Sequence, residues 1–369
     1  MTKYSSLILD SPESLRNNTV AWNLLWERSN VTSPLLRAEC IEHWMNHFAA
    51  GAAFHTLVIE SDGNFVAGIP LFRGNKVKPL RTGMLTSNDW AFCGDLLLDN
   101  SVDAGTVFDC LFATLKSLPY DLLWIDPVRF DHPQWKLFRE YLQETKRQSQ
   151  WLPRYQTAVV PLKGERESVT NLWKKNEIKH IRRRIRNNLS NSCELKVFDN
   201  TEQIESLLPE CFQLEDSGWK GAEGGSILKQ NKGTFFLEQA RLLAEQGFLR
   251  LYILFYAGKQ IAFQYCYRSK KTVLGQKVGI DDSLRQASPG QVLHLMINEQ
   301  LIDDSEIDYF DFMGIMAPNQ EIWNPEPQTV GQIVLPISFL GKTFFSLYDT
   351  VMPYIRRRRE SKQKKTEKE

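Results

Sequence analysis

One structural pattern, present twice, most constrains how this chain can fold. Each copy contains an apolar, alternating hairpin, then a further strand, an apolar helix and another strand. The hairpins lie at 57–71, with an Asp-Gly turn, and at 249–268, with a turn at Ala257-Gly258. Alternating apolar residues on both sides of a short turn predict two antiparallel strands. The repeat of roughly 150 residues is longer than a solenoid repeat and predicts two similar α/β domains.

The length of the chain agrees with two domains. Its 369 residues exceed the ~250–300 residues at which a single hydrophobic core stops growing. We place the boundary within 159–168, where an apolar strand gives way to charged residues. The expected domains are residues 1–165 and 166–345, followed by a basic tail at 346–369.

The composition excludes several classes of protein. A hydrophobic content of 42% and a charged content of 24% are typical of a folded protein. The chain lacks a long apolar run and an N-terminal signal peptide, which predicts a cytoplasmic protein. The six cysteines form no CxxC pair and the six histidines form no HExxH motif, so we expect no metal and no disulfide framework. His43 and His47 lie four residues apart and are interpreted as surface residues of a helix.

Two basic segments stand out, although the net charge is only +1. The first, Lys174–Arg186, has apolar residues at helical spacing and predicts an amphipathic helix. Its basic side chains either create a positive field beside a cleft or form an ordinary solvated face. The second begins at Arg356 and follows an apolar stretch. It is interpreted either as a contact with an anionic membrane surface, which would place the protein at the inner membrane, or as a solubilising tail.

A glycine-rich segment occupies residues 215–233. It lacks the Gly-Lys-Ser/Thr ending of a P-loop. Glycine permits mobility, so we interpret the segment either as a flexible active-site loop or as a long surface connection.

The segment Gly279–Ile302 contains the strongest candidate for a ligand site. Ser288 and Pro289 fit the N-cap and first position of a helix, and Gly290 keeps the first turn free of side chains. The N–H groups at such a helix start suit a phosphate, to which Arg285 can add an ionic contact. The alternative is an ordinary helix start that binds nothing.

These elements, in this order, resemble the GNAT acyltransferase superfamily. The sequences "GIDDSLRQASPGQVL" and "IDYFDFMG", followed by Trp323, are similar to acetyltransferases of cellulose or exopolysaccharide biosynthesis, which are related to the Fem-type peptidyltransferases. The sequences "RRRIRNNL", "EDSGW", "EQGFLRLYILFYAGKQIAF" and "LTSNDW" extend the resemblance over nearly the whole chain. It implies an α/β fold of tandem GNAT-like domains with mixed central sheets.

The resemblance also implies a donor substrate, acetyl-CoA or another acyl-CoA. Its pyrophosphate is expected at the helix start, where the implied donor-binding residues are Arg285, Ser288, Gly290 and Gln291. The segment departs from the glycine-rich GNAT signature, which leaves aminoacyl-tRNA open as a different donor. The matching N-terminal segment "DNSVDAGT" contains no basic residue, so we assign donor binding to the second domain only.

Acyl transfer from a thioester requires a general base and stabilisation of an oxyanion, but no separate nucleophile. The candidates for the base are Asp281, Asp311 and Glu215. The expected acceptor contacts are Trp219, Lys220, Trp323 and Arg183. Pro318 and Asn319 replace the Tyr-Lys pair that is usual in the family, which predicts a different acceptor or a reduced activity.

The sequence therefore predicts an acyltransferase that acts on an amine or hydroxyl of a sugar, a polysaccharide precursor or another small polar acceptor. Bacterial envelope or exopolysaccharide biosynthesis is the expected setting. Two alternatives remain. One is a Fem-like transferase that uses aminoacyl-tRNA. The other is a non-catalytic binding protein on a GNAT scaffold, whose basic helix docks nucleic acid or an anionic glycan.

Overall fold

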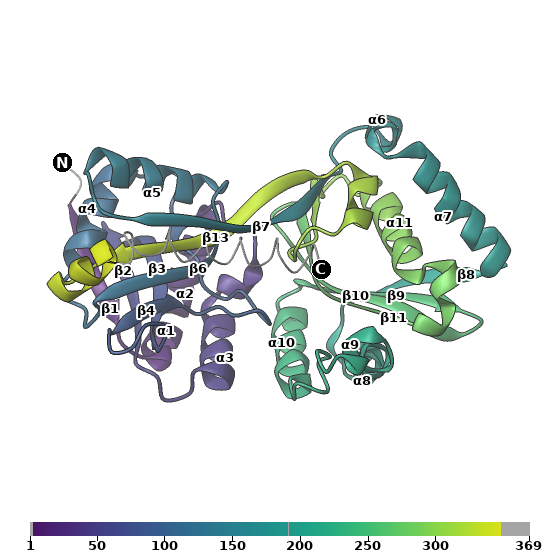
Figure 1. Cartoon of the computed structure of the whole chain (residues 1–369), viewed down its shortest axis with the longest axis horizontal. Coiled ribbons are helices and arrows are strands. Elements are labelled where there is room, and N and C mark those ends of the chain that lie inside the picture. Colours follow the sequence, from purple (N-terminus) through teal and green to yellow (C-terminus); the bar gives the residue numbers. More distant parts are fainter. Residues whose placement is uncertain (1–2, 191, 348–369) are drawn as a thin grey trace, which may run out of the picture. The chain divides into compact units, whose positions relative to one another are not determined.

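A computed structural model describes residues 3–190 and 192–347 of the chain. It divides into two compact units, each with its own series of neighbouring strands (Figure 1). Unit 1 comprises Met1–Asn30, Trp44–Pro153 and Gly331–Glu369, and unit 2 comprises Val31–His43 and Arg154–Val330. Most of the basic tail lies outside the described residues, so its interpretation is not tested. Among the described residues, no helix has the length and apolarity needed to span a bilayer.

The sheet of unit 1 has the strand order β1-β2-β3-β4-β6-β13. Neighbouring strands β1 to β4 are antiparallel, whereas β4 and β6 are parallel. The strands are β1 (Tyr4–Leu9), β2 (Phe54–Ser61), β3 (Asn64–Gly74), β4 (Thr82–Leu85), β5 (Leu97–Leu98), β6 (Leu122–Arg129) and β13 (Glu326–Pro336). The helices are α1 (Pro12–Asn17), α2 (Thr19–Arg28), α3 (Ala38–Phe48, shared between the units), α4 (Ala104–Leu115) and α5 (Pro133–Glu144).

The sheet of unit 2 repeats this order as β8-β9-β10-β11-β12-β7. Again the first four strands are antiparallel and the next pair, β11 and β12, is parallel. The strands are β7 (Gln150–Pro161), β8 (Cys193–Phe198), β9 (Leu249–Tyr256), β10 (Lys259–Ser269), β11 (Thr272–Ile280) and β12 (Tyr309–Asp311). The helices are η1 (Pro34–Leu36), α6 (Arg166–Leu172), α7 (Lys175–Asn188), α8 (Thr201–Ser217), α9 (Trp219–Ala222), α10 (Gly233–Glu245), η2 (Asp282–Ala287), α11 (Pro289–Ile302) and η3 (Pro318–Trp323).

The two mixed sheets, each combining parallel and antiparallel neighbours, confirm the predicted fold class. Both expected hairpins are present, as β2–β3 and β9–β10. Their turn residues have positive φ, at Asp62-Gly63 and at Ala257-Gly258, as two-residue hairpin turns that match the twist of the strands require.

The last strand of each sheet comes from a distant part of the chain. β7 follows the helices of unit 1, but its residues from Arg154 onward belong to unit 2, where they pair with β12. β13 follows unit 2, but its residues from Gly331 onward belong to unit 1, where β13 neighbours β6. The chain passes between the units at 30–31, 43–44, 153–154 and 330–331, and the last two of these positions lie inside β7 and β13.

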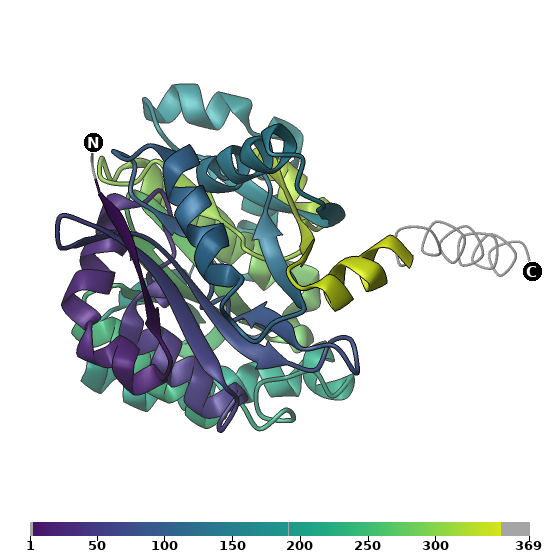
Figure 2. The ribbon, with the colours of Figure 1, turned by 90° about the vertical axis from the view of Figure 1, so that its left-hand side faces the viewer.

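Helices cover both faces of each sheet. In unit 1, α4 and α5 pack on one face through the aromatic cluster of Phe108, Phe138 and Tyr141, while α2 packs against β3 on the other face (Figure 2). In unit 2, α7 and α11 share a core with β9 to β11. α8 and α10 cover the opposite face, where Phe236 contacts Tyr265 of β10. The predicted amphipathic helix is α7, whose Ile178 and Ile181 are buried.

One buried carboxylate joins three segments of unit 1. Asp121, just before β6, accepts hydrogen bonds from the backbone and guanidinium of Arg81 and from Ser338 Oγ. The hydrogen bonds from Arg81 are the main reason that the pKa of Asp121 lies well below its usual range. Asp121 therefore stabilises the folded state while it is ionised, and this stabilisation is lost as the pH falls below the unfolded pKa of ~3.9 towards the folded pKa.

We expect Asp121→Asn to lower the free energy of unfolding by about 2 kcal/mol at pH 7, because charged hydrogen bonds are lost. The difference from the wild type should shrink as the pH falls below ~4, because the unfolded wild-type chain then binds a proton that the folded carboxylate does not. Urea unfolding between pH 2.5 and 7 measures both effects. Asp62→Asn, in the exposed β2–β3 turn, is the control, and an equal loss in that variant would contradict the assignment.

Candidate functional site

The parallel pair in unit 2 opens after a short distance. Pairing between β11 and β12 covers only Thr272–Leu274 with Tyr309–Asp311. β11 continues to Ile280, whereas the chain after β12 follows β7, since Phe312 N donates to Ala158 O and Met316 N donates to Gln156 O. The outer edge of β11 beyond residue 274 is therefore not paired with β12.

The orientation of the main chain identifies which groups point towards this opening. Asp281 N donates to Ile261 O of β10, and Phe263 pairs with Gly279. In an antiparallel pair, alternate residues direct their N–H and C=O groups to the same side. The odd-numbered residues 279 and 281 thus face β10, and Val278 and Ile280 face the opening.

The junction of α8 and α9 covers this edge. Lys220 Nζ donates to Val278 O at 2.6 Å and lies 2.9 Å from Glu215 Oε1. Gly218 is close enough to β11 that a Cβ there would lie 3.1 Å from Asp282 Oδ2 and 3.4 Å from Ile280 O. A cavity of about 80 Å³ at this edge is lined by Glu215, Gly218, Trp219, Lys220 and residues 278–280 of β11.

The helix α11 begins at Pro289, as predicted, but its start differs from the expected cap. Ser288 has a left-handed backbone, with φ of 52°, and its side chain makes no capping hydrogen bond. The N–H groups of Gln291 and Val292 both donate to Ser288 O, and Pro289 has no N–H. Among the described residues of this first turn, Gly290 therefore has the N–H that remains for a ligand.

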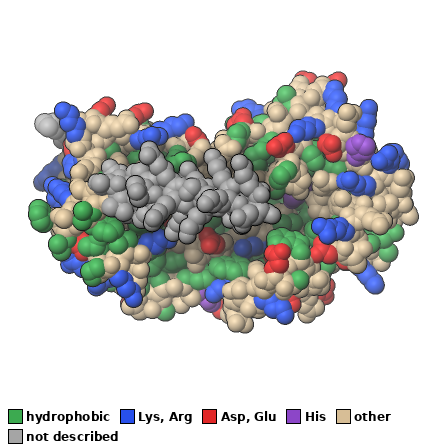
Figure 3. Space-filling model, in the orientation of Figure 1, with side chains coloured by type: hydrophobic (Ala, Val, Ile, Leu, Met, Phe, Trp, Pro, Cys, Tyr) green, Lys and Arg blue, Asp and Glu red, His purple; other side chains and the backbone are tan. Residues whose placement is uncertain are grey.

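The basic helix α7 brings a cation to this helix start that the sequence did not single out. Arg184 Nη1 donates to Gln291 Oε1 at 2.7 Å, and Asn188 Nδ2 donates to Gln286 O at 3.0 Å. Arg285 is exposed in η2. The guanidinium of Arg184 therefore lies at the first turn of α11, and Arg285 lies in the segment η2 that directly precedes this turn. Arg184 lies within a run of three arginines, 182–184, and helical periodicity alone could not show which of them faces α11. Lys and Arg side chains also gather over α6 and α7 on the visible face (Figure 3).

The three candidate bases have different surroundings. Asp281 is partly buried, and its Oδ1 accepts from Ser283 N and Oγ. Glu215 is almost fully buried, and its two oxygens are used by Lys220 and by Ile227 N. Asp311 is buried at the end of β12, and its Oδ1 accepts from Met313 N. Among the described residues, Asp281 Oδ2 accepts no hydrogen bond, which leaves an oxygen for a substrate proton.

The expected acceptor contacts do not lie together. Trp219 is 54% exposed, and its N–H donates to Asp282 Oδ2. Arg183 is exposed on α7. Trp323 lies in the core, where it packs edge-to-face on Trp173, so it does not line a groove. The sequence alone could not show whether Trp323 is a core residue or a binding residue, because tryptophan is common in both places.

Two histidines of unit 2 are core residues. His43 is buried, stacks on Phe235 and contacts the carbonyl of Phe235 through Nε2, which corrects its interpretation as a surface residue. His294 of α11 is buried and packs on Phe312, and its Nε2 lies 3.0 Å from Gln264 Oε1. Burial lowers the pKa of His294 to about 4, so it is neutral at pH 7.

The matching helix start in unit 1 has the opposite character. Asp103 caps α4, and its carboxylate accepts from Thr106 N at 3.0 Å. A carboxylate in this position already satisfies the N–H and repels a phosphate.

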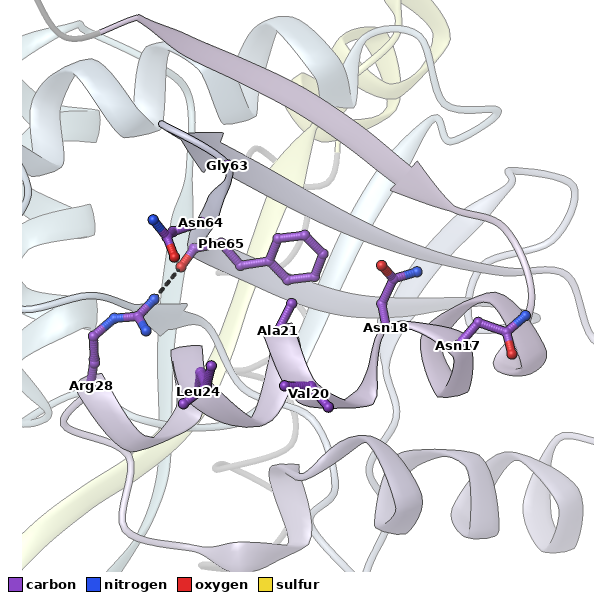
Figure 4. A pocket seen from close by; sticks show the side chains of 9 residues that line it. All are labelled: Asn17, Asn18, Val20, Ala21, Leu24, Arg28, Gly63, Asn64 and Phe65. Carbon is purple, nitrogen blue, oxygen red and sulfur yellow. Dashed lines mark hydrogen bonds between the residues drawn. The ribbon is translucent and has the colours of Figure 1, made fainter.

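A hollow in unit 1 lies between α2 and the β2–β3 turn (Figure 4). Its one cation, Arg28, is bound to Phe65 O and Asp99. Unit 2 is therefore the stronger candidate for a phosphate-containing ligand.

Residues 175–321 match the model of the acetyltransferase (GNAT) domain family. No curated protein matches the chain in sequence at a significant level. Several solved structures share its fold. FemX is 10% identical with a TM-score of 0.62, and the match covers 89% of this chain and 98% of FemX. A conserved protein of unknown function from Bacteroides thetaiotaomicron is 13% identical, with a TM-score of 0.58 and coverage of 89% and 100%.

A third structure is the C-terminal domain of a putative lysylphosphatidylglycerol synthetase from Agrobacterium fabrum. It is 11% identical with a TM-score of 0.54, and the match covers 92% of this chain and 97% of that domain. At these identities the three structures show a shared fold only. The family match covers α7 to η3, which are the elements that build the opening between β11 and β12. Residues 175–321 therefore form a GNAT acetyltransferase domain.

Proposed function

We propose that this protein transfers an acyl group, acetyl in the first instance, from acyl-CoA to an amine or hydroxyl of a small polar acceptor. A sugar or a polysaccharide precursor of bacterial envelope or exopolysaccharide biosynthesis is the proposed acceptor class. The observation that carries the proposal is the opening between β11 and β12, which lies beside a helix start where the guanidinium of Arg184 contacts Gln291. Unit 2 is proposed as the catalytic domain, and the Asp103-capped helix start of unit 1 as a degenerate counterpart.

The helix start suits the pyrophosphate of the donor. Arg184 and Arg285 supply positive charge, and Gly290 supplies an N–H next to the positive end of the α11 dipole. Gln291 orients Arg184 because its side-chain oxygen accepts a hydrogen bond from the Arg184 guanidinium. Ser288 contributes its main chain to the turn of the first residues of α11. The N–H of Val278 and the main-chain groups of Ile280 remain for the acyl arm along β11.

The reaction then needs one proton acceptor. The acceptor nitrogen or oxygen attacks the acyl carbon, a new C–N or C–O bond forms, and the carbonyl electrons move to the oxygen. Collapse of this intermediate breaks the C–S bond, and the thiolate of CoA leaves with the electron pair. We assign the proton of the attacking group to Asp281 Oδ2, because the oxygens of Glu215 are both used within the protein. Trp219, which lines the cavity at the β11 edge, is proposed to contact the acceptor.

Removal of either guanidinium should weaken donor binding. We expect Arg285→Ala and Arg184→Ala each to raise the Kd for CoA about tenfold or more, since a charged hydrogen bond contributes ~1.5 kcal/mol or more. The thermal midpoint with and without CoA reports this change, because a ligand of the native state raises the midpoint by mass action. Arg186→Ala, exposed on the same helix, is the matched control. No CoA-induced shift in the wild type at millimolar ligand would remove acyl-CoA as the donor.

Asp281→Asn should lower turnover by about a hundredfold or more, the usual contribution of a general base, without weakening CoA binding. Asparagine is as good an N-cap as aspartate, so the start of η2 should be retained. Release of CoA from acetyl-CoA, measured with an acceptor found by screening amino sugars, checks the rate. Asp282→Asn is the neighbouring control. Full turnover in a folded Asp281→Asn protein would exclude this base.

A further inference from the structure

The contacts of Lys220 point to a role beyond holding α9 in place. Its ammonium is tied to a strand edge that faces the opening, at Val278 O, and to the buried carboxylate of Glu215. The side chain of Lys220 is 23% exposed to solvent, whereas that of Glu215 is 3% exposed. A cation is thus held at a fixed position beside the main-chain groups of β11 that do not pair with β12.

The hydrogen-bonding capacity of this cation is not exhausted. An ammonium group has three donors, and Glu215 Oε1 and Val278 O take two of them. Lys220 lines the cavity of about 80 Å³ at the β11 edge. A typical small-molecule site has a volume of ~300 Å³ or more. The cavity is therefore of a size for the acyl end of a donor and not for its whole length.

We propose that the third N–H of Lys220 is directed to the acyl oxygen of the donor and that Lys220 is a catalytic residue. When the acceptor attacks, the carbonyl electrons move to that oxygen, and the ammonium stabilises the resulting negative charge. A fixed cation in a poorly hydrated site stabilises developing charge without reorganisation. Glu215 is a positioning residue, since it acts through Lys220. This inference rests on the proposed acyl-CoA donor.

Infrared spectroscopy tests the contact without knowledge of the acceptor. The probe is acetyl-CoA labelled with carbon-13 at the carbonyl, bound to the full chain, and the observable is its C=O stretching frequency. A hydrogen bond from an ammonium weakens the C=O bond. We expect a lower frequency on the wild type than in water, a return towards the free value in Lys220→Met, and partial retention in Lys220→Arg. Lys229→Met, an exposed lysine of the same glycine-rich segment, should match the wild type.

The outcomes separate the inference from the proposed function. Calorimetry that shows no acetyl-CoA binding to the wild type would remove the proposed donor and the inference together. Binding with the same C=O frequency in the wild type and Lys220→Met would overturn the inference alone. Tighter binding in Lys220→Met would also overturn it, because Lys220 would then only block the opening. Should Lys220→Met fail to fold by circular dichroism, Glu215→Gln must give a smaller frequency shift than the wild type.

Discussion

The candidate site depends on one feature of the sheet, the early separation of β11 from β12. Three paired positions hold the two strands together, and then β12 continues beside β7. A main chain that leaves a sheet must find other hydrogen-bond partners, since a buried and unpaired polar group costs about 1–3 kcal/mol. In unit 2, Lys220 satisfies Val278 O from the side. The same separation creates the cavity, brings the glycine-rich segment to the strand edge and exposes the start of α11.

The strand exchange between the sequence halves has a direct bearing on this opening. β7 belongs to the segment that precedes α6, and it guides the chain after β12 away from β11. Pro161 and Val159 of β7 pair with the two ends of β12. The position of the opening is therefore set by residues more than a hundred positions before β11 in sequence.

Local pattern was enough to predict the elements. The hairpins followed from period-two alternation and from the turn residues Asp62-Gly63 and Ala257-Gly258, and α7 followed from its isoleucine spacing. The mixed sheets were also predicted. The origin of the sixth strand in each unit was not, because strand pairing over long sequence separation leaves no local signal. The order of short motifs, and not any one motif, indicated the GNAT domain.

Single residues of the site were harder to predict, for reasons that differ among them. The sequence indicated Lys220 but not its contact with Val278 O, which depends on the turn at Gly218. It placed Ser288 correctly at the N-cap of α11 but could not show that its side chain makes no capping hydrogen bond there. Arg184 could not be distinguished from its basic neighbours, and Trp323 could not be recognised as a core residue. Side-chain type indicates a capacity for chemistry, whereas tertiary packing decides whether that capacity faces a cavity.

Hydrogen–deuterium exchange with and without acetyl-CoA tests the central claim most directly, because it maps a ligand onto the main chain without assuming any residue's role. The account predicts slower exchange on ligand binding at residues 276–280 of β11 and 290–292 of α11. It predicts no change at 103–107, the matching helix start of unit 1. Protection confined to unit 1, or no protection at the β11 edge under conditions where acetyl-CoA binds, would contradict it.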